Sequence, residues 1–284
     1  MLATYVVAVV VAVLVDDLVG VDDVLARALV GDLVATGVVF LASVLANNSS
    51  MYDPYWSVAP IALAAFWARA PAGGAADPAR VVLVVTLVCV WGGRLTLNFL
   101  RRWRGLGDED FRYRDLRARS GRAYWLVSLT GIHLFPTALV FAGMLPVWAV
   151  LTGPGGALGP LDVVAAVVTA SAIAVEAVAD AQLRRFLRGG PPAGAICATG
   201  LWRLSRHPNY FGEVLFWWGL WLFALAASPA LAWTAVGALA ITALFLGVSL
   251  PMMERRSRSR RPAYADHAAR TALLVPWPRP RRRL

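Results

Sequence analysis

The sequence predicts an all-α fold: a polytopic membrane helix bundle with seven or eight transmembrane helices. Composition is the first observation, because 59% of the 284 residues are hydrophobic, only 15% are charged and the mean hydropathy is +0.62. These values lie outside the range of ordinary soluble domains. The second and third observations are a series of long apolar runs and a clustering of the arginines into three segments.

Eight apolar runs are long enough, or nearly long enough, to cross a bilayer, which takes about 20 residues. They fall at 3–19, 29–46, 57–70, 81–100, 123–151, 160–183, 209–227 and 229–250. The third run is short, and the first contains Asp16 and Asp17 near its end, so seven and eight spans both remain open. Because the first run lacks a basic leader and a clear small-residue cleavage site, we expect a retained helix. We predict one membrane domain over 1–284, ending in a basic cytoplasmic tail at 255–284.

The arginines indicate the topology. All 27 basic residues are arginine, and 23 of them lie in three segments, at 101–122, 184–206 and 255–283. With eight spans these segments lie on the same side as the N-terminus, which the positive-inside rule makes cytoplasmic. We therefore expect an integral protein of a bacterial inner membrane with both termini in the cytoplasm. The net charge of +10 is then a topology signal, and we expect no nucleic-acid partner.

Three other features are expected to be structural. Cys89 and Cys197 suggest neither a disulfide framework nor a metal site, so we predict no metal. The longest polar connection, 101–122, is expected to form a short amphipathic element on the membrane surface. His133 stands alone in an apolar run, where a packed or hydrogen-bonded histidine is more common than a catalytic one.

The most informative segment runs from residue 204 to residue 213 and leads into an apolar stretch. Pro208 suits the first turn of a helix, because its φ is already helical and its missing N–H would have been unpaired there. Arg206 and His207 then lie just outside the N-terminus, where free backbone N–H groups and the helix dipole also favour a phosphate. The segment therefore predicts an anion site at the start of a membrane helix.

Polar side chains continue into that helix. Asn209 and Glu213 are four residues apart, so one helix face carries an amide and a carboxylate to the membrane boundary. Polar groups at such depth are usually functional. The alternative is a juxtamembrane basic cap whose arginine and histidine contact lipid headgroups.

Three further clusters place polar groups in or beside membrane helices. They are Arg94, Asn98 and Arg102 in the fourth run; Asp180, Gln182 and Arg184, within a stripe from Glu176 to Arg188; and Glu254, Arg255 and Tyr264 after the last run. Under the predicted topology all of them project to the cytoplasmic half. Such a set suits a large anionic cofactor, because arginine binds phosphate in a bidentate manner and carboxylates accept from ribose hydroxyls. The alternative is a set of intramembrane ion pairs, Asp180 with Arg184 above all, that fix helix packing.

The stretch from 47 to 56 contains a second candidate site. Asp53 before Pro54 is typical of a helix N-cap and first turn. Tyr52 and Tyr55 beside a carboxylate also form a plausible proton donor with an orienting partner. Both interpretations remain open from the sequence.

Residues 201 to 213, with the Trp-Trp-Gly that follows at 217–219, resemble the signature of the steroid 5α-reductase-like family, specifically its bacterial branch, DUF1295. Similar elements are the stretch at 52–56, Arg94 through Asn98 to Arg102, Asp180 with Gln182, and 251–255 followed by Tyr264 and 275–277. The resemblance covers most of the chain and is concentrated in 90–284. It implies a membrane enzyme that reduces an activated carbon–carbon double bond with NADPH, in an apolar steroid-, isoprenoid- or acyl-like lipid.

The resemblance also implies roles for individual residues. Asn209 matches the motif asparagine near the nicotinamide and phosphates, and its neighbours Arg206, His207, Tyr210 and Glu213 match flanking motif positions. Asp180 and Arg184 match cofactor contacts of the sixth helix, and Tyr264 matches the C-terminal tyrosine. Eukaryotic steroid reductases also pair an early glutamate with a later tyrosine. Asp53 could stand for the glutamate, but no tyrosine occurs near 91–94, so a steroid substrate does not follow.

Two other functions are compatible with parts of the sequence. Isoprenylcysteine and phospholipid methyltransferases share an Arg-His-Pro-x-Tyr-x-Gly pattern with a later glutamate, here Glu254, and use S-adenosylmethionine. Asn209, the pair Asp180 and Gln182, and the additional N-terminal helices favour the reductase. A transporter or lipid-binding scaffold would need polar residues through the outer half of the membrane, and the last two helices contain few. The oligomeric state does not follow from the sequence.

Overall fold

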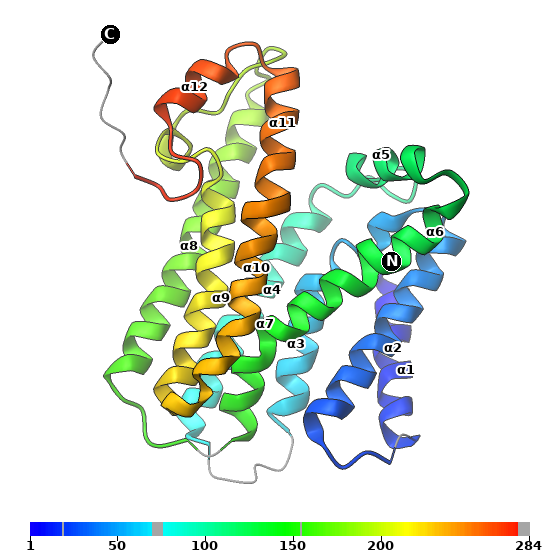
Figure 1. Ribbon diagram of the computed structural model, residues 1–284, viewed down its shortest axis with the longest axis vertical. Helices are drawn as coiled ribbons and strands as arrows, with labels where there is room; N and C mark the ends of the chain where they lie inside the picture. Colours follow the sequence, from blue (N-terminus) through cyan, green and yellow to red (C-terminus); the bar gives the residue numbers. More distant parts are fainter. Residues whose placement is uncertain (19, 70–75, 154, 278–284) are drawn as a thin grey trace. The chain divides into compact units, whose positions relative to one another are not determined.

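The computed structural model describes residues 1–18, 20–69, 76–153 and 155–277, and this part of the chain is helical without a β-strand (Figure 1). An isolated parallel bridge joins Ser205 to Ala272. The predicted all-α class is therefore confirmed. The chain divides into two compact units, Met1–Leu158 and Gly159–Leu284, a subdivision that the sequence did not indicate.

The first unit contains the helices of the N-terminal half. They are α1 (Leu2–Leu18), α2 (Val24–Leu45), a 3₁₀ turn (Ser49–Tyr52), α3 (Tyr55–Trp67), α4 (Pro78–Leu100), α5 (Phe111–Ser120), a 3₁₀ turn (Gly121–Ala123), α6 (Tyr124–Val127), a π-helical turn (Ser128–Leu134) and α7 (Phe135–Thr152). Helix α1 packs along α2, and α3 packs against α4 and α7. An ion pair between Arg27 and Asp16, 2.6 Å long, joins the first two helices.

The second unit is built on a close helix pair. Its elements are α8 (Pro160–Arg188), a 3₁₀ turn (Gly200–Arg203), α9 (Pro208–Ala227), a 3₁₀ turn (Pro229–Thr234), α10 (Ala235–Leu244), a π-helical turn (Phe245–Ser249), α11 (Leu250–Arg260) and α12 (Tyr264–Arg270). A Cβ atom on Gly212 would lie 2.7 Å from the Ala172 carbonyl oxygen, and one on Gly219 would lie 2.3 Å from Thr169 Oγ1. Because these contacts are impossible for a larger residue, the two glycines let α9 approach α8 closely.

Six helical segments are long and apolar enough to cross a membrane. They are Val24–Leu45, Pro78–Leu100, Phe111–Thr152, Pro160–Arg188, Pro208–Ala227 and Pro229–Arg260. Two of the eight predicted runs form shorter helices, since the apolar part of α1 is Ala3–Asp16 and α3 has 13 residues. The six long helices indicate an integral membrane protein, and a count of seven or eight spans is not established by them.

The polar connection at 101–122 contains a helix, as predicted. Helix α5 begins after Asp110, whose Oδ1 accepts the Arg112 backbone N–H at 2.8 Å. Its ten residues include four arginines and an aspartate, and its few apolar side chains, such as Tyr113 and Leu116, pack against the core of the first unit. The predicted basic tail begins as the end of α11 and continues through α12, and its residues 278–284 lie outside the described part of the chain.

Candidate functional site

A carboxylate at the end of the second unit gathers three hydrogen-bond donors. Arg206 Nη1 donates to Oε2 of Glu254, and the Tyr264 hydroxyl donates to Oε1 at 2.5 Å. His207 Nε2 lies 2.9 Å from the same Oε1 atom. The structure thus brings together four predicted site residues from the start of α9, from α11 and from α12. We call these four residues the Glu254 cluster.

The chain just before α9 is held by its own hydrogen bonds. The Arg206 backbone N–H donates to the Ala272 carbonyl at 2.9 Å, and Ser205 Oγ donates to the Leu274 carbonyl at 2.6 Å. Ser205 Oγ also accepts the His207 backbone N–H at 3.1 Å. The segment after α12 therefore holds Ser205 and Arg206 in place by hydrogen bonds.

Helix α9 begins as the sequence predicts, with Pro208 in its first turn. His207 is the N-cap residue, and its side chain makes no capping hydrogen bond. Its imidazole stacks on the Tyr210 ring at a centroid distance of 5.5 Å, and Tyr210 meets Phe245 edge-on at 5.0 Å. The first turn of α9 thus begins beside an imidazole that is fixed by ring stacking.

The titrating groups of the cluster remain hydrogen-bond donors near neutral pH. Burial lowers the pKa of His207, although Glu254 opposes this effect, so the ring is neutral and its Nε2–H faces the carboxylate. Burial and the Glu254 carboxylate raise the pKa of Tyr264 to about 12, so its hydroxyl keeps its proton. The negative charge is therefore on Glu254, opposite the Arg206 guanidinium.

One buried donor of the cluster has no hydrogen-bond acceptor among the described residues. Arg206 Nε is fully buried and unpartnered, whereas the Asn209 amide is only half-buried. Buried donors are almost always satisfied in folded proteins. Beside the start of a helix, a guanidinium nitrogen of this kind fits an anion such as a phosphate.

Other predicted cofactor residues of this unit have different surroundings. Gln182 Oε1 accepts the Leu201 backbone N–H at 2.9 Å, and Glu213 Oε1 accepts the Trp217 indole N–H at 2.9 Å. Asp180 is buried on α8 with Arg184 half-buried one turn later, whereas Arg255 is exposed. A hollow of about 370 Å³ opens beside Gln182, lined by Gln182, Arg185, Phe186, Thr199 and Gly200.

In the first unit, the two predicted catalytic tyrosines lie side by side, with ring centroids 5.2 Å apart. The Tyr55 hydroxyl donates to Asp32 Oδ1 at 2.7 Å. The Tyr52 hydroxyl lies 2.8 Å from Thr137 Oγ1, which is itself 2.9 Å from Thr36 Oγ1. All five side chains are buried, so α2, α3 and α7 enclose a polar cluster between apolar helices.

Asp53 does not orient either tyrosine, and the N-cap prediction for it was wrong. Pro54 is the N-cap residue of α3, and Asp53 ends the preceding 3₁₀ turn. Its Oδ1 accepts the Tyr113 hydroxyl at 2.6 Å and lies 4.0 Å from Arg112. The carboxylate that contacts Tyr55 is Asp32, which our sequence reasoning missed. A single acid within the apolar run 29–46 was the available signal, because charges inside membrane helices are rarely incidental.

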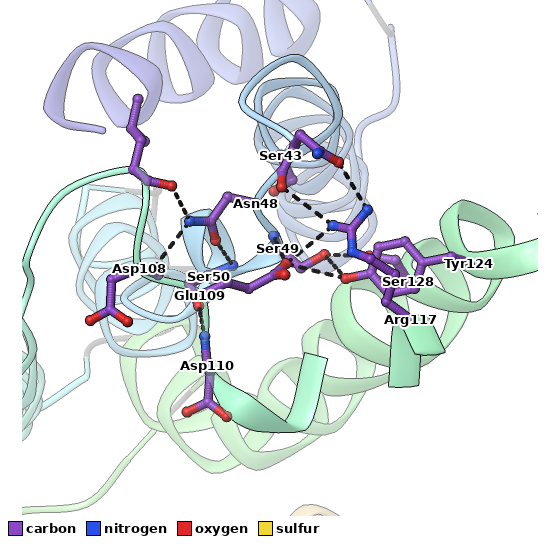
Figure 2. Close-up of polar contacts among 12 residues, drawn as sticks. Ser43, Asn48, Ser49, Ser50, Asp108, Glu109, Asp110, Arg117, Tyr124 and Ser128 are labelled. Atoms are coloured by element: carbon purple, nitrogen blue, oxygen red, sulfur yellow. Dashed lines mark hydrogen bonds and ion pairs between the residues drawn. The ribbon is translucent and has the colours of Figure 1, made fainter. Parts of the chain in front are cut away.

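The segment before Tyr52 is docked on the polar connection at 101–122 (Figure 2). The Asn48 amide donates to the Asp108 carbonyl at 3.1 Å, and the Asp110 backbone N–H donates to Ser50 Oγ at 2.9 Å. The Ser49 backbone N–H donates to Glu109 Oε1 at 2.8 Å. These bonds fix the turn that carries Tyr52.

His133 is a packed, hydrogen-bonded residue, as predicted. Its ring is fully buried, with Nδ1 2.9 Å from the Ser128 carbonyl oxygen and Nε2 3.1 Å from Ser43 Oγ. It also contacts the Tyr52 ring at a centroid distance of 4.8 Å. Both ring nitrogens are thereby used within the fold.

The three predicted cofactor residues of the fourth run all lie on α4, in the first unit. Asn98 is buried, Arg94 is half-buried, and Arg102 is exposed with its Nε donating to the Asn98 carbonyl at 3.3 Å. The Glu254 cluster belongs to the other unit. That these three residues contact the same cofactor stays a prediction.

Replacing Glu254 with alanine is expected to destabilise the protein by about 3 kcal/mol, because Arg206 and His207 would keep buried donors with no acceptor. Arg258 is the matched control, since its guanidinium is 56% exposed and lies 3.9 Å from Glu254. Exposed pairs of this kind contribute below about 1 kcal/mol, so Arg258→Gln should change little. Thermal unfolding in detergent measures both, and equal effects of the two variants would contradict the role assigned to Glu254.

Asp53 predicts a pH dependence of stability. Burial raises its pKa to about 6 from an ordinary value of 3.8, although Arg112 and Tyr113 act in the opposite direction. The folded state therefore binds the proton more tightly than the unfolded state, and this stabilisation is lost as the pH rises from about 4 through about 6. The unfolding temperature of Asp53→Asn minus that of the wild type should increase over this interval. Asp115→Asn, at an exposed site, is the control, and a constant difference for Asp53→Asn would disprove the assignment.

Comparison with known proteins identifies the family. The profile of DUF1295, described as a protein of unknown function, matches residues 39–271. An uncharacterized protein of Schizosaccharomyces pombe, C594.04c, is 28% identical over 258 residues, covering 82% of this chain and 74% of that protein. No solved structure matches the chain. The matched range covers most of the chain and includes both Tyr52 and the Glu254 cluster. The chain therefore belongs to the DUF1295 family.

Proposed function

We propose that this protein is a membrane-embedded reductase that uses NADPH to reduce an activated carbon–carbon double bond in an apolar lipid. The observation that carries the proposal is the fully buried Arg206 Nε, a donor without an acceptor among the described residues, beside the start of α9. Asn209 lies half-buried in the first turn of the same helix. A buried guanidinium that keeps one N–H without an acceptor at a helix N-terminus is suited to a phosphate. The resemblance to steroid 5α-reductase-like enzymes makes a phosphorylated dinucleotide the preferred ligand.

The residues of the second unit divide into supporting and binding groups. Glu254 occupies one face of the Arg206 guanidinium and fixes His207, so it orients the binding side chains. Arg206, Asn209, Tyr210, Asp180, Arg184 and Tyr264 are the residues that would hold the nucleotide. NADPH, when bound, supplies the hydride for the reduction.

The first unit offers a hydroxyl to polarise the substrate carbonyl. A phenol has one proton to donate, and that of Tyr55 is engaged by Asp32. Tyr52 can instead accept the hydroxyl proton of Thr137 and keep its own proton available. We therefore assign Tyr52 as the donor and Tyr55, held by Asp32, as a positioning residue that packs against its ring.

The same proposal includes the finer topology and location. Eight spans, with both α1 and α3 as shorter membrane segments, would put the N-terminus on the same face as the three arginine-rich segments, whereas seven would put it on the opposite face. We propose that this face and both termini are cytoplasmic, in a bacterial inner membrane. An apolar lipid substrate could then enter from the bilayer while the nucleotide binds from the cytoplasm.

A methyltransferase that uses S-adenosylmethionine is the second candidate. The supporting observation is that Glu254 contacts both Arg206 and His207. These residues correspond to the motif and the later glutamate that isoprenylcysteine and phospholipid methyltransferases share. Ligand affinity separates the two functions, because each cofactor fits only one of them.

The purified protein is expected to bind NADPH and not S-adenosylmethionine. Asn209→Ala should reduce NADPH affinity about 10- to 100-fold, because it removes one amide donor at the start of α9 without disturbing the Glu254 cluster. Ser259 on α11 donates its hydroxyl to the Arg256 carbonyl of the same helix. The control variant Ser259→Ala should therefore bind NADPH like the wild type. Titration with both nucleotides in detergent is the measurement. Unchanged NADPH affinity in Asn209→Ala, or tight S-adenosylmethionine binding alone, would reverse the assignment.

Replacing Tyr52 and replacing Tyr55 should lower the turnover rate by different amounts. Tyr52→Phe is expected to lower kcat about 100-fold or more, the usual contribution of a positioned proton donor, with NADPH affinity unchanged. Tyr55→Phe keeps the aromatic packing and loses only the bond to Asp32, so a smaller decrease is expected. Single-turnover reduction of an α,β-unsaturated lipid ketone measures both. A larger loss for Tyr55→Phe would exchange the two roles.

A further inference from the structure

The arginines at 101–122 are divided into two groups by the fold. Arg112 Nε lies 2.8 Å from Asp110 Oδ1, and Arg117 Nη2 lies 3.3 Å from Glu109 Oε1. Arg117 also lies over the Tyr124 ring, 3.9 Å from its centroid. These two arginines are therefore neutralised within the first unit, and they use the two acids that follow Asp108.

The remaining arginines of the segment form an exposed group without ion pairs among the described residues. They are Arg101, Arg102, Arg104, Arg114, Arg119 and Arg122, which we call the arginine surface. Only Asp108 and Asp115 are exposed acids in the same segment. Six positive charges against two negative ones leave a strong positive excess on one polar connection.

This connection joins two apolar helices. Helix α4 ends at Leu100, and the next apolar run begins near Tyr124. Exposed leucines flank the arginines, with Leu100 at 52%, Leu106 at 53% and Leu126 at 66% exposure. Trp103 packs on Phe99 at a centroid distance of 5.3 Å. Leucine and tryptophan beside arginine are typical of a membrane–water interface.

We propose that the arginine surface docks on the phosphate headgroups of anionic phospholipids. A guanidinium binds a phosphate with two parallel hydrogen bonds, and clustered basic residues next to a membrane helix attract anionic lipids. The internal acids are already used by Arg112 and Arg117, so the exposed arginines have no competing carboxylates within α5 except Asp115. Docking would hold α5 in place, and with it the Tyr113 bond to Asp53 beside Tyr52.

A fluorescent label on α5 tests this proposal directly. Ala118 is exposed and lies one helical turn after Arg114 on α5. The variant Ala118→Cys, in a Cys89→Ala and Cys197→Ala background, would carry a polarity-sensitive fluorophore in lipid nanodiscs. The emission should shift to shorter wavelength in nanodiscs with 30% phosphatidylglycerol compared with pure phosphatidylcholine, and 0.5 M salt should reduce the shift.

Three variants test whether the emission difference between the two lipids depends on the positive charge of the arginine surface. Replacing the six arginines of the surface with glutamine should abolish the difference between the two lipids, whereas six lysines should retain most of it. The double variant Arg114→Gln and Arg122→Gln, which alters the fold least, should reduce it at least by half. Equal emission in the two lipids would overturn the proposal. A matching shift on adding inorganic phosphate to phosphatidylcholine nanodiscs would overturn it too, by making the site one for free anions.

Discussion

The Glu254 carboxylate is the interaction on which the second unit's site depends. It accepts from Arg206, His207 and Tyr264, and so connects the start of α9 to α11 and α12. A guanidinium placed among apolar helices without such an acceptor would be strongly unfavourable. Glu254 accepts a hydrogen bond from Arg206 Nη1 and so stabilises the guanidinium. The Nε–H group of the same side chain remains available. The same contact thus holds the fold together at this point and leaves one donor for the anion that we propose.

The first unit also shows that buried polar groups need hydrogen-bond partners. Asp32, Thr36, Tyr52, Tyr55 and Thr137 are buried, and each has its partner within the group. A polar group in an apolar environment is unfavourable unless it is hydrogen-bonded, so the positions of these side chains constrain one another. Hydroxyls can donate and accept at once, which carboxylates cannot do. This difference is what makes Tyr52 a donor in our proposal and Tyr55 a partner of Asp32.

Much of the helical architecture was predictable, because apolar runs of the right length can form little else in a membrane. All eight predicted runs form helices within the described part of the chain, yet the short length of α3 shows that composition does not settle which helices span. Pro208 and the Glu254 cluster were predictable from helix-start chemistry and from polar residues beside apolar runs. Asp32 was missed because its meaning depends on Tyr55, 23 residues away, and only the packing of α2 on α3 brings them together. Asp53 was misassigned for the same reason, since its acceptor role is set by Tyr113 on a distant helix.

Two buried polar residues of this chain differ in whether their donors are satisfied. His133 lies among apolar helices, and the fold uses both of its ring nitrogens. Arg206 Nε is also fully buried, but it has no acceptor among the described residues. A buried donor left open reduces stability unless something else binds it. An anionic ligand at Arg206, as we propose, would supply the missing acceptor.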